Sequence, residues 1–429
     1  MANPDNHGSL SNPSSRGSLR GSPFAAVRIK EFKNLVLGRF VFIIALRMMT
    51  TLVGWWIYQL TNAAFAIGLV GLSEVIPAVS FALYAGHVID ISEKRWMLLR
   101  GVLLYFAAAS VLLLLSTTFT RDHLSNHSIA ICIYGVIFCT GIIRSFTGPV
   151  FNVILAQIVP KDILQNATTW NQGAWLSASV TGHALGGLLI AYFGITGALI
   201  AIVTAIFGSF LVLLSGLNPK PPLNEKGEKR TWESVQEGLR FVFRTKELLG
   251  AISLDLFAVL FGGAVAMVPV YARTILHVGA IGYGWLNAAS DMGSIFVVIL
   301  LTIFPLQRQQ GKKLLLVVAG FGLCIIIFGL SRIYLISFCA LMISGMLDGV
   351  SVVVRGTITQ LKTPDNMRGR VLSVNSMFIN SSHELGQFES GLAAHILGNV
   401  PSVVFGGCMT LLVVIITWFK APTLRKLEY

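Results

Sequence analysis

Charge is what this sequence has least of. Only 12% of its 429 residues are Asp, Glu, Lys or Arg, whereas 54% are hydrophobic. A soluble globular domain carries about twice that charged fraction. The composition therefore excludes a soluble protein and predicts an integral membrane protein. A formal net charge of +13 raises the question of nucleic acid, but lysines and arginines that fix topology from membrane loops explain it better. We expect no nucleic-acid partner.

The sequence also lacks the common motifs of catalysis and metal binding. It contains no HExxH, no GxSxG and no P-loop, so we expect neither an enzyme nor direct use of ATP. Its five cysteines all lie in apolar runs without a CxxC pair. That placement is typical of small core residues and not of disulfides or a zinc site. We expect no metal and no organic cofactor.

Residues 1–33 contain no apolar run of the kind that a signal peptide needs. They are rich in Ser, Gly, Asn and Pro, so we expect a disordered cytosolic tail.

Twelve apolar stretches are long enough to cross a bilayer, which takes about 20 residues. They lie at about 35–60, 67–90, 96–118, 129–157, 166–192, 195–217, 248–275, 281–304, 312–331, 333–361, 368–396 and 399–419. The chain is thereby divided into a six-helix bundle at 34–217, a cytosolic loop at 218–246, a second six-helix bundle at 247–419 and a cytosolic tail at 420–429. The second part of the loop, from Thr231, is predicted to form an amphipathic helix on the membrane surface.

The distribution of basic residues predicts the topology. If the amino terminus is cytosolic, 26 of the 32 lysines and arginines fall on the inner side, three within helices, and only Arg121, Arg273 and Arg332 on the outer side. Cytosolic loops are the ones enriched in Lys and Arg. We therefore predict a multi-pass protein of the cell (inner) membrane with both termini in the cytosol.

A weak internal repeat relates the two halves. Residues 141–194 match residues 345–398 without a gap at an offset of 204, and nine positions are identical, four of them glycines. Gly194, for example, falls on Gly398. Arg144 falls on Asp348, so the halves share a pattern but differ in the charge placed in the membrane. Such repeats are typical of transporters whose halves rock around a central site.

Ionised side chains inside the membrane are the best functional candidates, because burying a charge costs several kcal/mol unless it is paired or hydrated. They either line a polar cavity for substrate and protons or form structural ion pairs. The candidates are Arg47, Arg144, Arg355, Glu74, Asp255, Asp291, Asp348 and Glu384.

The position of each candidate along its helix favours one interpretation or the other. Arg144, Asp291 and Asp348 lie near mid-helix, which favours a cavity. Asp255 and Glu74 lie nearer the membrane surfaces, so gating or structural roles are at least as well supported. Arg355 follows Asp348 by seven residues on roughly the same face and compensates local acids in the simplest interpretation. Glu384 is placed in the outer half of its helix, where it could line an exit path.

One loop resembles a signature of the major facilitator superfamily. The segment from Gly86 to Arg100 reads GHVIDISEKRWMLLR, with a glycine, an aspartate four residues on, and then basic residues. In that superfamily this motif ties helix 2 to its neighbours in the outward-open state through contacts between charges and helix dipoles. The resemblance implies this gating role for Asp90, Lys94 and Arg95.

Two further segments resemble exporters of the same superfamily. Arg144 is similar to the helix 4 arginine that proton-coupled exporters use near their proton site. The run Gly182-His183-Ala-Leu-Gly186-Gly187 resembles the helix 5 pattern Gly-Pro-x-x-Gly-Gly, with His183 in place of the proline. The glycines of this pattern permit close helix packing. The segment 359–370, TQLKTPDNMRGR, resembles the enterobactin-exporter branch.

The resemblance implies an all-α membrane fold of twelve helices in two pseudo-symmetric six-helix bundles. It also implies a secondary active transporter that exports a small amphipathic molecule, such as a siderophore or a drug, in exchange for protons. The alternatives are uptake or flipping of an organic anion or lipid-like molecule, which the buried arginines favour, and a non-transporting membrane scaffold. We expect a monomer whose partners are the substrate, protons and the bilayer.

Overall fold

This computed structural model describes residues 24–219, 232–304, 309–364 and 367–427. They contain helices and no strand. The first half holds α1 (Lys30–Thr61), α2 (Ala64–Ile91), α3 (Lys94–Leu115), the short α4 (Thr118–His123), α5 (Asn126–Ile158) and α6 (Leu164–Gly216). The second half holds α7 (Trp232–Arg244), α8 (Lys246–Phe261), α9 (Val268–Val270), α10 (Ala280–Ile303), α11 (Gln310–Leu330), α12 (Tyr334–Lys362), α13 (Arg368–Leu397), α14 (Asn399–Lys420) and α15 (Pro422–Arg425). The amino-terminal tail expected at 1–33 lies mostly outside the described residues.

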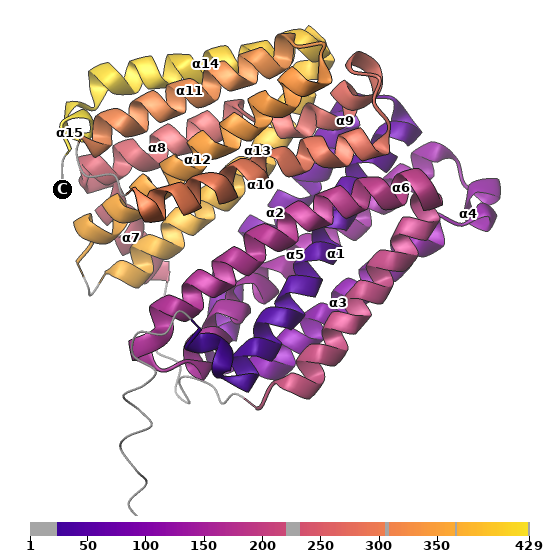
Figure 1. The fold of residues 1–429 in the computed structure, drawn as a ribbon, viewed down its shortest axis with the longest axis horizontal. Helices are drawn as coiled ribbons and strands as arrows, with labels where there is room; N and C mark the ends of the chain where they lie inside the picture. Colours follow the sequence, from indigo (N-terminus) through magenta and orange to yellow (C-terminus); the bar gives the residue numbers. More distant parts are fainter. Residues whose placement is uncertain (1–23, 220–231, 305–308, 365–366, 428–429) are drawn as a thin grey trace, which may run out of the picture.

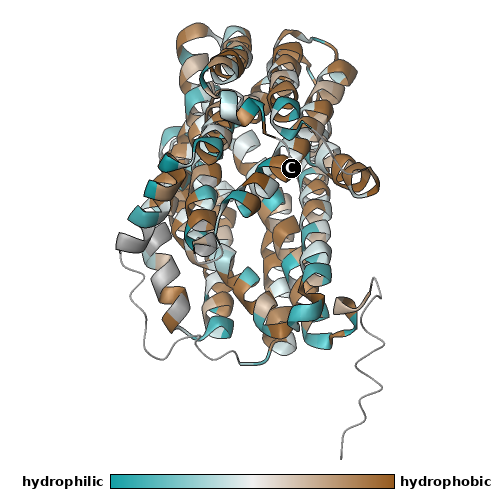
Figure 2. Cartoon of the chain, turned by 90° about the vertical axis from the view of Figure 1, so that its left-hand side faces the viewer, coloured by the Kyte–Doolittle hydropathy of each residue, from teal (hydrophilic) through white to brown (hydrophobic). Residues whose placement is uncertain are grey.

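The membrane-spanning character of the helices is confirmed. Ten helical stretches of the described residues are long and apolar enough to cross a bilayer. One of the ten contains all of α6, although the non-helical backbone of Gly194 divides α6 into two helices. The helix α13 has 30 residues but is not among the ten. A count of twelve spans therefore stays a prediction. In Figure 2 brown, which marks hydrophobic residues, predominates along the long helices, as expected for helices that cross a bilayer.

The span predicted at 248–275 is present as a candidate membrane span, Lys246–Ile275, but it is not one continuous helix. A single helix was expected over 248–275, but α8 ends at Phe261 before two successive glycines. The chain then continues as a 3-10 turn (Ala264–Met267), α9 and a π-helical turn (Tyr271–Ile275). Adjacent glycines at 262 and 263 weaken helix continuity, and Pro269 removes a backbone donor just beyond them.

The two glycines at the end of the repeat adopt the same unusual backbone. Gly194 has φ +67° and Gly398 has φ +91°, and each separates two consecutive helices. Positive φ is costly for residues with a Cβ atom, which explains why glycine occupies both positions. The repeat seen in the sequence thus corresponds to a repeated turn.

Equivalent glycines also pack against equivalent helices. A Cβ atom on Gly141 in α5 would meet the Glu74 backbone of α2, and one on Gly345 in α12 would meet the Ser290 backbone of α10. Each glycine therefore lets the fourth long helix of its half approach the second one. The duplicated sequence encodes duplicated helix crossings.

The two halves meet through a pair of such crossings, α2 with α13 and α6 with α10. Gly68 packs against Gly391 in the first crossing, and Gly187 against Gly284 in the second. We call the end of the molecule that carries α4 and the turn at Gly194 the α4 end, and the opposite end, where α1 begins and α15 lies, the terminal end. These glycine contacts lie toward the α4 end, and in Figure 1 the two groups of helices converge there and diverge toward the terminal end.

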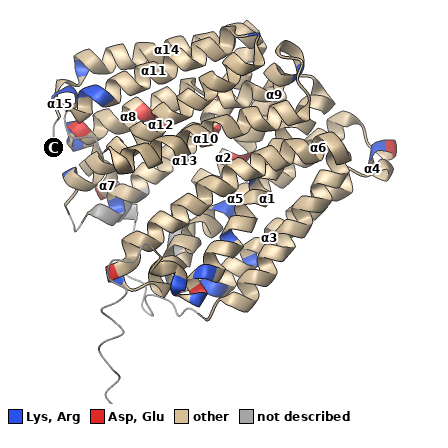
Figure 3. Cartoon of the chain, viewed as in Figure 1, with Lys and Arg blue, Asp and Glu red and all other residues tan. Residues whose placement is uncertain are grey.

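Figure 3 shows that the Lys and Arg residues lie mainly toward the terminal end. This is the end that the topology prediction assigns to the cytosol. The amphipathic helix predicted in the loop is present as α7, and it packs on α13. Glu237 of α7 forms an ion pair with Arg370 at the start of α13, so the segment between the halves is attached to the second half.

A small side chain at the α6–α10 crossing should destabilise the protein. A Cβ atom on Gly187 would collide with the Ala280 carbonyl oxygen, and backbone atoms have little freedom to move away. Gly187→Ala should therefore cost about 1–3 kcal/mol, as overpacking does elsewhere. Thermal unfolding of the purified protein in detergent measures the effect.

Gly135→Ala is the matched control, because Gly135 is an exposed helical glycine of α5 with nothing within 4 Å of an added Cβ atom. There the same substitution should leave the melting temperature unchanged or raise it slightly, since alanine is the better helix former. Equal shifts for the two variants would contradict the close crossing.

Candidate functional site

Three clusters of polar and charged side chains lie midway along the long helices. Two of them join the first half to the second, and the third lies within the second half. Seven of the eight predicted membrane charges belong to these clusters. The eighth, Arg47, forms no ion pair with a described residue.

The first cluster centres on Arg144 of α5. Its Nη1 atom lies 2.5 Å from an oxygen of Glu74 on α2 and 2.5 Å from an oxygen of Glu384 on α13. The close approach of α5 to α2 at Gly141, one turn earlier, places Arg144 beside Glu74. Two carboxylates share one guanidinium, so the cluster has a net charge of −1 when both are ionised. It has room for one more positive charge, such as a proton.

Glu384 connects the halves, whereas the sequence suggested a place on an exit path. Its side chain is buried, with 8% of its surface exposed, while that of Arg144 is 43% exposed. Breaking a buried ion pair by removing one partner leaves an uncompensated charge. The Arg144–Glu384 contact therefore holds α5 and α13 together in this state.

The second cluster centres on Asp291 of α10. The Ser179 hydroxyl of α6 donates a hydrogen bond to Asp291 Oδ2 at 2.5 Å, and His183 Nε2 lies 3.8 Å from the same oxygen. The other ring nitrogen of His183, Nδ1, is 2.7 Å from the Thr51 hydroxyl of α1. His183 thus lies between the first helix of one half and the second helix of the other. This cluster is the counterpart, at the α6–α10 crossing, of the Arg144 cluster at the α2–α13 crossing.

The third cluster lies entirely within the second half. Arg355 of α12 contacts Asp255 of α8, and its Nη2 atom lies 3.7 Å from Asp348 of α12. The Arg355 and Asp255 side chains are both buried, while that of Asp348 is 34% exposed. Asp255 and Arg355 therefore form a buried pair, and Asp348 remains the accessible member of the cluster.

Arg47 of α1 differs from the other predicted arginines. Its guanidinium carbon lies 5.1 Å from the ring centre of Trp175 on α6. A second arginine of α1, Arg39, hydrogen bonds the side-chain oxygens of Asn152 and Asn171 at 3.1 and 2.9 Å. Sequence reasoning missed Arg39 because it was counted with the basic residues of the inner surface. Its position within the first apolar stretch was the available signal.

The loop that resembles the superfamily signature is partly described. Gly86 and Asp90 lie in the last two turns of α2, but their side chains are outside the described ones. Lys94 is buried and donates to the Ser92 carbonyl at 2.9 Å. Arg95 donates to the Leu214 carbonyl, at the end of α6, at 2.9 Å. A cation at a helix carboxyl terminus is a favourable contact with the helix dipole, so this loop is attached to α6 of its own half.

The glycine-rich run of α6 packs two helices at once. A Cβ atom on Gly182 would meet Arg47 and the Ile44 carbonyl oxygen of α1, and Gly186 faces α1 as well. Gly187, one residue further on, faces α10. At this run, α6 therefore contacts α1 of its own half and α10 of the other half, and His183 lies between the glycines.

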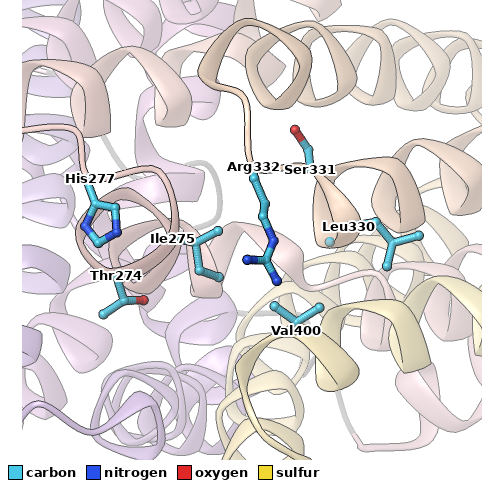
Figure 4. A pocket seen from close by; sticks show the side chains of 8 residues that line it. Thr274, Ile275, His277, Leu330, Ser331, Arg332 and Val400 are labelled. Carbon is cyan, nitrogen blue, oxygen red and sulfur yellow. The ribbon is translucent and has the colours of Figure 1, made fainter.

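A pocket of about 230 Å³ lies apart from these clusters, at the α4 end of the second half. Figure 4 shows Arg332, His277 and Thr274 among the side chains around it. None of the eight predicted membrane charges lines it.

Loss of Arg355 should be strongly destabilising, because it would leave Asp255 buried without a counter-ion. Removal of one partner of a buried pair typically costs about 3–5 kcal/mol, whereas replacing both partners with apolar side chains is close to neutral. Arg355→Met should therefore lower the melting temperature strongly, and the double variant Asp255→Leu with Arg355→Met should recover most of the loss. A double variant no more stable than the single one would contradict a structural ion pair.

Comparisons with known proteins agree with this architecture. A family model described as "Transmembrane secretion effector" matches residues 21–428. The uncharacterized MFS-type transporter YfmI of Bacillus subtilis is 21% identical over 384 residues, which are 86% of this chain and 91% of that protein. The enterobactin exporter EntS of Citrobacter koseri is 26% identical over 346 residues, which are 79% of each chain.

Solved structures share the fold at low sequence identity. A POT family transporter in complex with 5-aminolevulinic acid gives a TM-score of 0.73 at 10% identity and covers 92% of this chain and 96% of that one. The nucleoside transporter NupG gives 0.68 at 13% identity and covers 93% of this chain and 100% of that one. With the family match over nearly the whole sequence, the chain belongs to the transmembrane secretion effector family of major facilitator transporters.

Proposed function

We propose that the protein exports a small amphipathic molecule, siderophore-like or drug-like, by alternating access coupled to protons. The observation that carries the proposal is the Arg144 cluster, in which one arginine of the first half is shared by a carboxylate of each half. A group that joins the halves and has room for a proton is what coupling requires, since proton and substrate must favour different states.

The direction of transport rests on the relatives and on this structure. EntS relatives carry the name of enterobactin exporters. The halves meet toward the α4 end, which the topology prediction places outside. The side chains of Arg144 and Asp348 are 43% and 34% exposed, and in this proposal they are reached from the cytosol. An exporter loads its substrate in such an inward-facing state.

Charge balance suggests how a proton takes part. In this state Arg144 neutralises Glu384. For the outer end to open, α13 must leave α5, and the Glu384 charge then needs another partner. A proton from the outside supplies it. When the outer end closes again, Arg144 replaces the proton, which leaves toward the cytosol. Substrate binding must provide the free energy that separates Arg144 from Glu384 on the outward step.

The remaining clusters have supporting roles in this scheme. Asp291 must lose Ser179 as α6 leaves α10, so it is a second contact that changes with the state. Asp348, the partly exposed acid of the third cluster, is a candidate contact for the substrate. Asp90 with Arg95 forms the inner gate, with Arg95 anchored on the end of α6.

Efflux from cells that make the protein tests the proposal. A panel of fluorescent drugs and a catecholate would be loaded, with and without a protonophore. Wild-type export should stop with the protonophore, and Arg144→Ala should lower the export rate at least tenfold. An export rate that is the same with and without the protonophore would contradict proton coupling. Accumulation of an organic anion or a lipid-like probe, with no export of any compound, would favour uptake or flipping instead.

Glu384→Gln separates coupling from transport. In proteoliposomes this variant should still exchange labelled for unlabelled substrate, because glutamine mimics the protonated acid, but it should no longer concentrate substrate in response to a pH gradient. Glu389→Gln is the matched control, since Glu389 lies five residues further along α13 and forms no ion pair with a described residue. Equal loss of gradient-driven transport in both variants would contradict a specific role for Glu384.

A further inference from the structure

Four arginines inside the described membrane helices fall into two classes. Arg144 and Arg355 each have carboxylate oxygens within 4 Å. Arg39 and Arg47, both on α1, have none among the described residues. Within the described part of the chain, two cations of the first half thus lack an acidic partner.

Neutral groups hold Arg39. Its Nη1 atom donates to the Asn152 and Asn171 side-chain oxygens, and its guanidinium carbon lies 5.1 Å from the Phe151 ring centre. Its Nε atom is buried without an acceptor among the described residues. Amide oxygens orient the guanidinium but leave its full positive charge, so the charge remains available to an anion.

Arg47 is held still more loosely. The ring of Trp175 is its one contact among the described residues. Glu74, Asp291 and His183 lie farther away and interact with Arg47 only electrostatically. Asn171 and Trp175 are four residues apart on α6, which is about one turn or 6 Å. The guanidinium groups of Arg39 and Arg47 therefore lie against neighbouring turns of one strip of α6.

A pair of unmatched cations in the membrane is costly unless an anion or water accompanies them. Arginine forms bidentate contacts with planar oxyanions, and its own face stacks on aromatic rings. We propose that Arg39, Arg47 and Trp175 form the binding site for an anionic group carried next to a flat aromatic ring, such as an aromatic carboxylate. This inference rests on the proposed function, because it assigns the substrate class of the proposed transporter.

Acidic residues of the second half indicate how the substrate is oriented in the proposed site. The second half contributes Asp291, Asp348 and Glu384. Glu384 lies beside Arg144 and Asp348 lies beside Arg355, whereas Asp291 has no arginine within 4 Å among the described residues. Acidic groups there repel an anion. The anionic end of the substrate therefore lies against α1 and α6, and its neutral or cationic end faces α10 and α12.

Three probes on one ring test the charge preference. The purified full-length protein in lipid nanodiscs would be titrated calorimetrically with 2-naphthoate, the neutral 2-naphthamide and the cationic 2-naphthylmethylammonium. We expect wild-type protein to bind 2-naphthoate at least tenfold more tightly than 2-naphthamide, since hydrogen bonds between charged groups are the stronger ones. The cation should bind the weakest of the three.

Variants test which residues cause the preference for 2-naphthoate. Arg47→Gln and Arg39→Gln should each reduce the preference for 2-naphthoate about tenfold and leave 2-naphthamide unchanged. Arg47→Lys should keep part of it, and Trp175→Leu should weaken all three probes together. Arg121→Gln, at the α4 end, is the control and should change nothing. Melting temperatures establish that each variant is folded, and the two single arginine variants test the same site independently.

Some results would overturn the inference. These are equal binding of 2-naphthoate and 2-naphthamide by the wild type, no binding of 2-naphthoate up to millimolar concentration, or a preference that survives in the Arg39→Gln, Arg47→Gln double variant. Binding in nanodiscs needs no proton gradient. Failure here with protonophore-sensitive efflux intact would remove the substrate assignment alone. A preserved preference with protonophore-insensitive efflux would remove proton coupling alone.

Discussion

The Arg144 guanidinium between Glu74 and Glu384 is the contact on which the rest of this structure depends. Three ionised groups in the membrane are tolerable only together, because each alone would be a buried and uncompensated charge. Two of them lie in one half of the molecule and the third in the other. One ion-pair cluster thus includes residues of both halves, and we propose that its charge state is coupled to the relative position of the halves.

Close helix crossings make that contact possible. An arginine reaches across two helices only where their backbones come near, and glycine at 141 brings α5 onto α2 just before Arg144. The glycine pairs 68 with 391 and 187 with 284 bring the halves together at the same two crossings. In a membrane, where apolar surface gives little driving force for helix association, small residues of this kind decide which helices touch. Glycine spacing thus determines which helices bring the charged side chains of the candidate site together.

Hydropathy predicted where the helices lie, but it did not predict which residues of different helices contact each other. Bilayer thickness fixes the length of a span, so apolar runs located nearly every helix to within a few residues. The repeat also identified Gly194 and Gly398 before their shared backbone conformation was known. The partner of Arg144, by contrast, is 240 residues away on α13, and neither spacing nor charge sign along one helix encodes such a pairing. Arg39 was missed for a related reason, since a loop count assigns residues by position along the chain and ignores where a long side chain reaches.

The two halves of the repeat differ in the charge that they place in the membrane, and this difference bears on how the halves interact. Arg144 and Asp348 occupy equivalent positions of the repeat, yet one is basic and the other acidic. If both positions carried the same charge, these two residues would repel each other wherever the two halves approach. In this structure Arg144 instead contacts an acidic residue of the other half, Glu384. In the proposed mechanism, a substrate offsets that attraction with its own contacts to both halves. We propose that Arg39 and Arg47 of α1, which have no carboxylate within 4 Å among the described residues, provide these contacts in the first half.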